Sequence, residues 1–472
     1  MNIDVEVKNL GQLKHGKIRI RPLTVIAGPN GTGKSFFTKF MYSFLNVINK
    51  NVFHTSIEDS IKRLKALLRG FSNQLTYASE QDMNLIRNAD FFLDTFNDDL
   101  TTANQWNISE YLEHSRSKAK EYSDFSNSVK VYFSELSKKE KKYKSISRIA
   151  NNINKINNEL HNKLENSFSH YVECIVSTLD NELKENFQTP DIRDLISHDQ
   201  NNMQISVSEL FKVGVNTDGV NFSLEHEFIN EVSSLSRVVF FESPAYWKVR
   251  DALLHAKNSH WGGFFINKGA NNNLNGVPKY FYDLDKSLKI ESKNENTPEV
   301  KRICDEIYEA LNGEVLFKGD DLVFKEKNSG REISKNLISF GMTNLGMIQC
   351  LLKNNVVTPG SFLFIDEPET NLHPNWQVLL MQTLVALADN NINIIIATHS
   401  IDMLKALEVS VKETNNTRDI TEFMSVNYFD SNGELFEFDS KDPLDNLDEA
   451  KIALNSSYSK LYFKGLKCDT DK

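Results

Sequence analysis

One eight-residue stretch near the start of the chain restricts its fold more than any other feature, because it fits the pattern G-x-x-x-x-G-K-[ST]. It consists of Gly28, Pro29, Asn30, Gly31, Thr32, Gly33, Lys34 and Ser35. Residues 23–27 before it form a short apolar, β-branched run typical of a buried strand, and residues 35–48 after it predict a helix. Glycines let backbone N–H groups surround phosphate oxygens, and a helix N-terminus adds a positive dipole. The pattern predicts a phosphate-binding loop in which Lys34 reaches the β- and γ-phosphates and Ser35 ligates Mg²⁺.

A second stretch supplies carboxylates of the kind that a nucleotide site needs. Residues 361–366 read as a buried strand that ends at Asp366, followed by Glu367. Asp366 is expected to hold Mg²⁺, directly or through its water. Glu367 is expected to orient or deprotonate the water that attacks the γ-phosphate. A carboxylate pair at a strand end can also be a helix cap, but the phosphate loop elsewhere in the chain favours the catalytic interpretation.

Two further stretches fit the same site. Residues 392–398 predict another buried strand, followed by His399, whose side chain would point into the ligand crevice and sense or stabilise the γ-phosphate. Ser339 and Gly341 lie at the start of a predicted helix, where a hydroxyl, backbone N–H groups and the helix dipole make an anion site. An ordinary helix cap is the alternative for this last stretch.

Composition limits the class of protein. The chain has 472 residues and a net charge of −10, so it is not a basic nucleic-acid binder as a whole, although a local patch is not excluded. Its four cysteines show no C-x-x-C spacing, which predicts neither a zinc motif nor a disulfide framework. The first residues lack the basic start and apolar core of a signal peptide, so none is expected, and no apolar run approaches a membrane span. A cytoplasmic protein without membrane contact is expected.

The pattern along the chain predicts an α/β ATPase interrupted by helices. We expect residues 1–51 and 201–440 to form the two parts of the ATPase domain, 52–200 a helical, coiled-coil-like insertion, and 441–472 a C-terminal helix and tail. The insertion is predicted from Ile146, Ile149, Ile153, Ile156 and Leu160, which recur in alternating three- and four-residue steps. Further strands are expected at 3–10, 17–21, 204–207, 220–224, 237–241, 314–317, 322–324 and 434–438, and helices at 300–311 and 449–461, with Gly465 beyond the last as a stop.

Along the chain the four motifs come in the order phosphate loop, Ser-x-Gly helix start, apolar strand with Asp-Glu-Pro, and Thr-His-Ser. In this order they resemble the ABC-type ATPase head, a P-loop NTPase with a mixed sheet and flanking helices. The branch shared by SMC and RecF repair ATPases and by OLD-type (overcoming lysogenisation defect) proteins is most similar. The resemblance covers about residues 1–50 and 200–430, and Glu-Pro-Glu-Thr-Asn-Leu-His-Pro at 367–374 is especially like OLD-type and related defence ATPases. The insertion carries no motif.

The resemblance implies ATP and Mg²⁺ as cofactors and two heads that sandwich two ATP molecules. Ser339 and Gly341 would contact the γ-phosphate bound to the opposite subunit, and Asn371 would lie in the loop that crosses the dimer axis. Phe36 would join the phosphate loop in lining the nucleotide. Phe340 departs from the usual Ser-Gly-Gly or Ser-Ser-Gly signature. The glutamine that normally follows the first helix has only Gln74 and Gln81 as candidates.

OLD-type nucleases also carry a TOPRIM nuclease domain, with a glutamate and an Asp-x-Asp strand end. Asp469-Thr470-Asp471 matches Asp-x-Asp but follows no predicted strand, so we expect this chain to lack its own nuclease. It then resembles the ATPase subunits of two-gene bacterial anti-phage systems such as PARIS and Septu. This implies a homodimer or higher oligomer that senses a phage trigger protein and controls a separate effector, such as a nuclease.

Two other interpretations stay open. A DNA-repair ATPase that clamps DNA would use the helical seam and the basic run from Lys138 to Lys144, with Arg148 one turn beyond, although such runs are more often solvated helix faces. The ATPase subunit of a membrane transporter is disfavoured by the large insertion and by the departure from the transporter signature.

Overall fold

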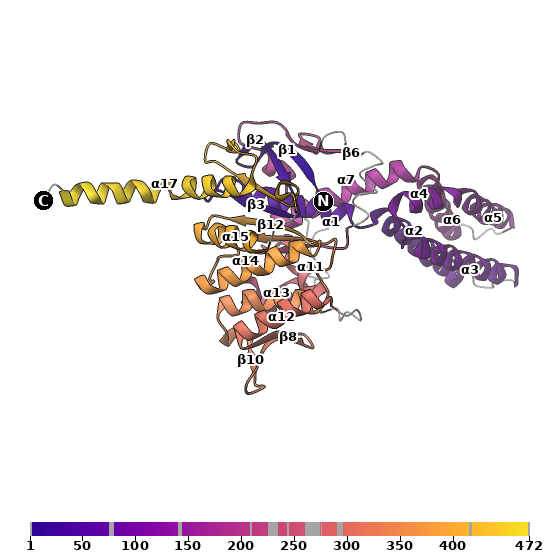
Figure 1. The fold of residues 1–472 in the computed structure, drawn as a ribbon. Helices are drawn as coiled ribbons and strands as arrows, with labels where there is room; N and C mark the ends of the chain where they lie inside the picture. Colours follow the sequence, from indigo (N-terminus) through magenta and orange to yellow (C-terminus); the bar gives the residue numbers. More distant parts are fainter. Residues whose placement is uncertain are drawn as a thin grey trace. The chain divides into compact units, whose positions relative to one another are not determined.

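The computed structural model describes residues 2–74, 80–139, 144–207, 210–224, 235–242, 245–259, 274, 276–289, 296–414 and 418–470. The chain forms two compact units. The first comprises Met1–Asn49, Asp180–Phe222 and Leu235–Lys472, and the second comprises Lys50–Leu179 and Ser223–Ser234. Figure 1 labels many of their helices and strands.

The centre of the first unit is a five-stranded parallel sheet in the order β13-β3-β12-β11-β7. Its strands are β3 (Leu23–Ala27), β7 (Val238–Phe241), β11 (Phe362–Asp366), β12 (Asn393–Thr398) and β13 (Met424–Tyr428). Almost every residue in them is buried, which explains their continuous apolar sequences. The register pairs Ile365 with Phe241 and Thr398 with Ala27, so the carboxyl ends of β3, β7, β11 and β12 meet at one edge. Ligands bind at this edge in open α/β sheets.

Helices pack against this sheet and against one another. The helix α1 (Lys34–Ile48) contacts β7, β11 and β12, while α14 (Pro374–Asp389) contacts β12 and α15 (Ile401–Thr414). The unit also contains α9 (Ala245–Lys248), α10 (Arg250–Ser259), α11 (Lys279–Leu288), α12 (Pro298–Leu311), α13 (Phe340–Lys353), α16 (Ile420–Phe423) and α17 (Pro443–Thr470), with 3₁₀ turns at Ile192–Leu195 and Lys335–Leu337.

Two antiparallel sheets complete the strands. One has the order β2-β1-β4-β5-β6, with β1 (Ile3–Leu10), β2 (Leu13–Ile20), β4 (Met203–Val207), β5 (Phe211–Asn216) and β6 (Gly219–Leu224). The other has the order β10-β9-β8, with β8 (Gly313–Lys318), β9 (Asp321–Glu326) and β10 (Glu332–Ser334). The side-chain amide of Asn427 in β13 bonds the backbone of Arg19 in β2, accepting from its N–H at 2.9 Å and donating to its carbonyl at 3.0 Å.

The second unit is helical. It contains α2 (Val52–Gln74), α3 (Glu80–Ala103), α4 (Ile108–Ser117), α5 (Ala119–Lys139), α6 (Lys144–Glu165) and the first part of α7 (Ser167–Phe187). The helix α6 packs against α2 and α5, and Ile153 and Leu160 from its predicted seam are fully buried, as is Leu164 one turn beyond. Of the basic run, residues 140–143 lie outside the described part of the chain.

The structure differs from the sequence predictions mainly in one strand, one helix and the end of the helical unit. The strand expected at 434–438 is wrong: only isolated bridges form, at Glu434 and Leu435, and the Phe436 N–H donates to the Tyr428 carbonyl at 2.8 Å. The Phe436 ring packs against Tyr428 and Phe438, so the apolar side chains contact nearby rings instead of lining one face of a sheet. The last helix runs from Pro443 through Gly465 to Thr470, since a glycine inside a helix costs only about 1 kcal/mol. The compact helical unit includes α7 only to Leu179, not the chain to residue 200, because the last two turns of α7 bond to α1.

Candidate functional site

The phosphate loop lies between β3 and α1, at the ligand edge of the parallel sheet. All three of its glycines, Gly28, Gly31 and Gly33, have positive φ angles, of 147°, 80° and 96°, which favour glycine. A Cβ atom at Gly28 would also meet the Phe429 carbonyl oxygen at 2.3 Å. The predicted loop therefore has backbone geometry that only its glycines allow, and it turns directly into the N-terminus of α1.

Lys34 is the first residue of α1, and only 4% of it is exposed. Its Nζ donates to the carbonyl oxygens of Gly28 at 2.8 Å and Pro29 at 2.7 Å. Burial lowers the pKa of the Lys34 ammonium, and the carboxylates at 366, 367 and 369 oppose this shift. The ammonium therefore lies inside the loop, within the field of the carboxylates at the end of β11.

Asp366 ends β11 and is 5% exposed. Burial raises the pKa of its carboxyl to about 6, a hydrogen bond from Ser35 opposes that shift, and the negative charge of Glu242 adds to it. Its Oδ1 atom is buried without a hydrogen-bond partner among the described residues. A serine hydroxyl beside a carboxylate with a free oxygen is a donor set that suits Mg²⁺, so Ser35 and Asp366 fit the predicted metal ligands. In the described part of the chain, no group of three or more His, Cys, Asp or Glu residues could hold a metal ion by itself.

Glu367 lies in the left-handed region, with φ of 48°, and its N–H donates to the Ala397 carbonyl at 2.9 Å. Such a conformation is uncommon for a residue other than glycine and concentrates at functional sites. The Glu367 side chain is 44% exposed, and its Oε1 lies 3.7 Å from Nδ1 of His399. The turn thus places the two predicted catalytic side chains close together.

Glu369 was not predicted as a site residue, yet it organises the end of β12. Its Oε1 accepts from Thr398 Oγ1 at 2.8 Å and from the His399 N–H at 3.0 Å, and it lies 3.2 Å from His399 Nδ1. Its side chain is only 9% exposed. Glu369 therefore joins the turn after β11 to the turn after β12. The signal in the sequence was the second acidic residue of Glu-Pro-Glu at 367–369.

Glu242 was also missed. It follows β7, whose Phe241 pairs with Ile365, so Glu242 lies level with Asp366 at the sheet edge. The signal available in the sequence was an acidic residue directly after the strand predicted at 237–241.

The two candidates for the glutamine that normally follows the first helix do not lie at this sheet edge. Gln74 ends α2 and Gln81 lies in the first turn of α3, both in the second unit.

The start of α13 contacts the loop that follows Glu367. Ser339 caps α13, accepting from the Met342 N–H at 3.2 Å. A Cβ atom at Gly341 would meet the Asn371 carbonyl oxygen at 2.8 Å, which explains a glycine there. Asn371 itself has φ of 62°. The structure thus brings the start of α13 next to Asn371: Ser339 and Asn371 are exposed, Gly341 is buried, and Leu337 just before them is 79% exposed.

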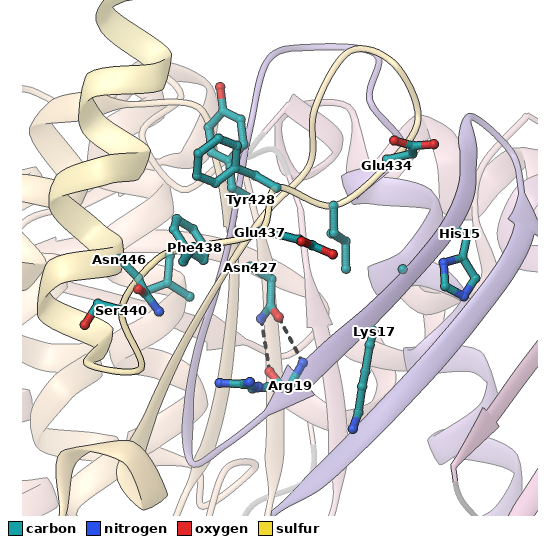
Figure 2. Close-up of a pocket in the computed structure, with 14 residues that line it drawn as sticks. His15, Lys17, Arg19, Asn427, Tyr428, Glu434, Glu437, Phe438, Ser440 and Asn446 are labelled. Carbon is teal, nitrogen blue, oxygen red and sulfur yellow. Dashed lines mark hydrogen bonds between the residues drawn. The ribbon is translucent and has the colours of Figure 1, made fainter.

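A cavity of about 620 Å³ lies elsewhere in the first unit (Figure 2). Side chains from β2, β13, the segment after β13 and the base of α17 line it, with Lys17 and Arg19 on one wall and Glu437 and Phe438 on another. Its lining includes no residue of the phosphate loop, of the Asp366–Glu367 pair or of the β12 end, so it is separate from the predicted site.

The sheet and the site define a P-loop ATPase of the α/β class. Residues 1–404 of the 472 match a family described as AAA ATPase domain, and the chain belongs to that family. The predicted fold class is confirmed, whereas the resemblance to OLD-type, PARIS and Septu proteins stays a prediction. No curated protein matches significantly. None of the described helices is long and apolar enough to cross a membrane.

Solved structures that match the chain include heads of SMC proteins. The SMC head domain from Thermotoga maritima is 10% identical, with 93% of this chain and 99% of that chain covered and a TM-score of 0.35. The Smc head with an extended coiled coil bound to the C-terminal domain of ScpA, derived from Pyrococcus furiosus, is 10% identical, with 92% and 94% covered and a TM-score of 0.37. The cbiO1 protein of Clostridium perfringens, part of an ABC transporter complex, is 13% identical, with 56% and 78% covered and a TM-score of 0.24.

Proposed function

We propose that this chain binds ATP with Mg²⁺ and hydrolyses the γ-phosphate at the edge of the parallel sheet. The observation that carries the proposal is the buried Asp366 carboxylate, which bonds Ser35 beside the phosphate loop and keeps one oxygen free. Burying a charged carboxylate costs free energy. Next to a loop that binds phosphate, a cation that Asp366 ligates would offset this cost and explains why the residue is there.

Each site residue has a role in this proposal. The backbone N–H groups of residues 28–33 and the Lys34 ammonium bind the phosphates, and Ser35 and Asp366 hold Mg²⁺. The bound Mg²⁺ would neutralise the charge that develops on the phosphate oxygens. Glu367 orients or deprotonates the attacking water, because its half-exposed carboxylate follows Asp366 directly. Glu369 fixes the backbone of His399 and so sets where the imidazole lies.

We further propose that two copies associate around ATP. Ser339 and Gly341 would contact the γ-phosphate bound to the other copy, and Asn371 would lie close to the dimer axis, as in the ABC-type heads that the chain resembles. Support comes from the exposed start of α13 and its packing on the loop that carries Asn371. If this is correct, ATP should raise the mass of a variant that binds but does not hydrolyse it.

The wider role that we propose is control of a separate effector, such as a nuclease, in defence against phage. The membership in an ATPase family and the sequence similarity of residues 367–374 to defence ATPases support this role. Clamping of DNA is the alternative, favoured by the basic run at 138–144.

The test is a pull-down of tagged Glu367→Gln protein from its native host with ATP present, followed by mass spectrometry and a nucleic-acid assay. A nuclease-like protein encoded next to this one would support effector control. Abundant DNA without a protein partner, lost as salt is raised, would overturn it in favour of the clamp. The same pull-down with Lys34→Ala protein is the control for ATP-independent capture.

A further inference from the structure

The carboxylate of Glu242 is held at both of its oxygens. Oε1 lies 3.0 Å from Nζ of Lys39, which is one turn past Ser35 on α1, and Oε2 accepts a hydrogen bond from the Tyr280 hydroxyl. Lys39 also lies 5.5 Å from the centre of the Tyr280 ring. Because Glu242 follows the strand beside β11, this clamp fixes a second carboxylate level with Asp366.

Tyr280 is rigidly placed in turn. It lies in the first turn of α11, it is 2% exposed, and its ring packs against Phe240 at 4.5 Å and Tyr42 at 6.1 Å between ring centres. Burial, and next the charge of Glu242, raises the pKa of the phenol well above its ordinary value, so the hydroxyl stays protonated and donates. The position of the hydroxyl therefore depends on where α11 begins.

The start of α11 is bonded to the end of α7. The Tyr280 N–H donates to Oδ1 of Asn186 at 2.9 Å, and Nδ2 of Asn186 donates to Oγ of Ser43 on α1 at 2.9 Å. Asn186 is 1% exposed. One turn earlier on α7, Glu182 lies 3.1 Å from Nζ of Lys279. A buried polar cluster of this kind holds a single geometry only while every member keeps its partner.

We propose that Tyr280 and Asn186 are positioning residues of the nucleotide site. Tyr280 holds Glu242 beside Asp366 through its hydroxyl, and Asn186 holds the first turn of α11 through its side-chain amide. Together they join the last turns of α7 to Glu242, which lies level with Asp366 and whose negative charge acts on that carboxyl. This inference rests on the proposed ATPase function, because its effect is exerted through Asp366.

Removal of the Tyr280 hydroxyl tests the inference. In Tyr280→Phe the ring contacts stay, but Oε2 of Glu242 loses its donor. The Mg²⁺ concentration that half-saturates binding of a fluorescent ATP analogue should rise about tenfold, the lower end of the effect of removing an outer-shell partner from a metal site. Tyr282→Phe, on the same helix, is the matched control, since that hydroxyl donates to the Leu253 carbonyl at 3.5 Å. Equal Mg²⁺ requirements in the two variants would overturn the proposal.

A second variant and a measurement without nucleotide complete the test. Asn186→Ala should raise the Mg²⁺ requirement in the same direction. In nucleotide-free protein, Tyr280→Phe should speed hydrogen exchange at the amides of 238–242, and Tyr282→Phe should not. If wild-type protein binds no ATP, the proposed function fails, and the exchange result still decides whether Tyr280 holds the end of β7. Unchanged exchange in Tyr280→Phe would refute that role.

Discussion

Replacing Asp366 with asparagine should make the nucleotide-free protein more stable while it destroys the site. The pKa of Asp366 rises from 3.8 to about 6 because the carboxyl is buried, which corresponds to roughly 3 kcal/mol against the charged form at neutral pH. Asparagine carries no charge, so its burial avoids that cost and keeps an oxygen that can accept from Ser35. We expect a gain of up to about 3 kcal/mol in the free energy of unfolding at pH 7.5.

The gain should depend on pH in a defined direction. The folded protein binds the Asp366 proton more tightly than the unfolded chain, so the contribution of Asp366 to the free energy of unfolding falls as pH rises from about 4 to about 6 and is constant above that. The advantage of Asp366→Asn should therefore be largest above pH 6 and shrink toward pH 4.

Urea unfolding followed by tryptophan fluorescence, with EDTA present, measures this difference across pH 4 to 8 on the wild type and the variant. The exposed Asp305→Asn on α12 is the control for loss of a charge and should change little. An Asp366→Asn protein that is no more stable than wild type at pH 7.5, or whose advantage does not shrink below pH 6, would refute the assignment of a buried, costly carboxylate.

Two further substitutions test other parts of the site. Lys34→Ala should abolish ATP binding, measured by isothermal titration calorimetry, because the ammonium that meets the phosphates is lost; normal ATP affinity would disprove the phosphate-loop assignment. Glu369→Ala should lower the rate of ATP hydrolysis about tenfold at saturating ATP with little change in ATP affinity, because it frees the turn that carries His399. An unchanged rate of phosphate release would show that Glu369 serves only folding.

The sequence was sufficient where a functional side chain follows its own local signal. The glycines of residues 28–33 and the apolar strands before Asp366 and His399 each predict an element and the residue at its end. Parallel pairing then brings those ends to one edge, so Lys34, Asp366 and His399 could be placed together without any knowledge of distances.

Residues that depend on pairing between distant segments could not be predicted. Glu242 gains its position from the register of β7 with β11, two strands more than 100 residues apart, and Tyr280 gains its role only from the way α11 meets that strand. The end of the helical unit was misplaced for the same reason: α7 is one continuous helix in sequence, and only the tertiary bonds of Glu182 and Asn186 assign its last turns to the first unit.

The proposal that Glu367 activates the water for ATP hydrolysis is tested most directly by comparing wild-type and Glu367→Gln protein with ATP and Mg²⁺. Phosphate release and ATP binding are both measured. We predict that the variant binds ATP as well as wild type, releases phosphate at least about 100-fold more slowly and accumulates as an ATP-bound dimer or larger oligomer. Phosphate release at the wild-type rate would contradict the catalytic role of Glu367, because another group would then orient the attacking water.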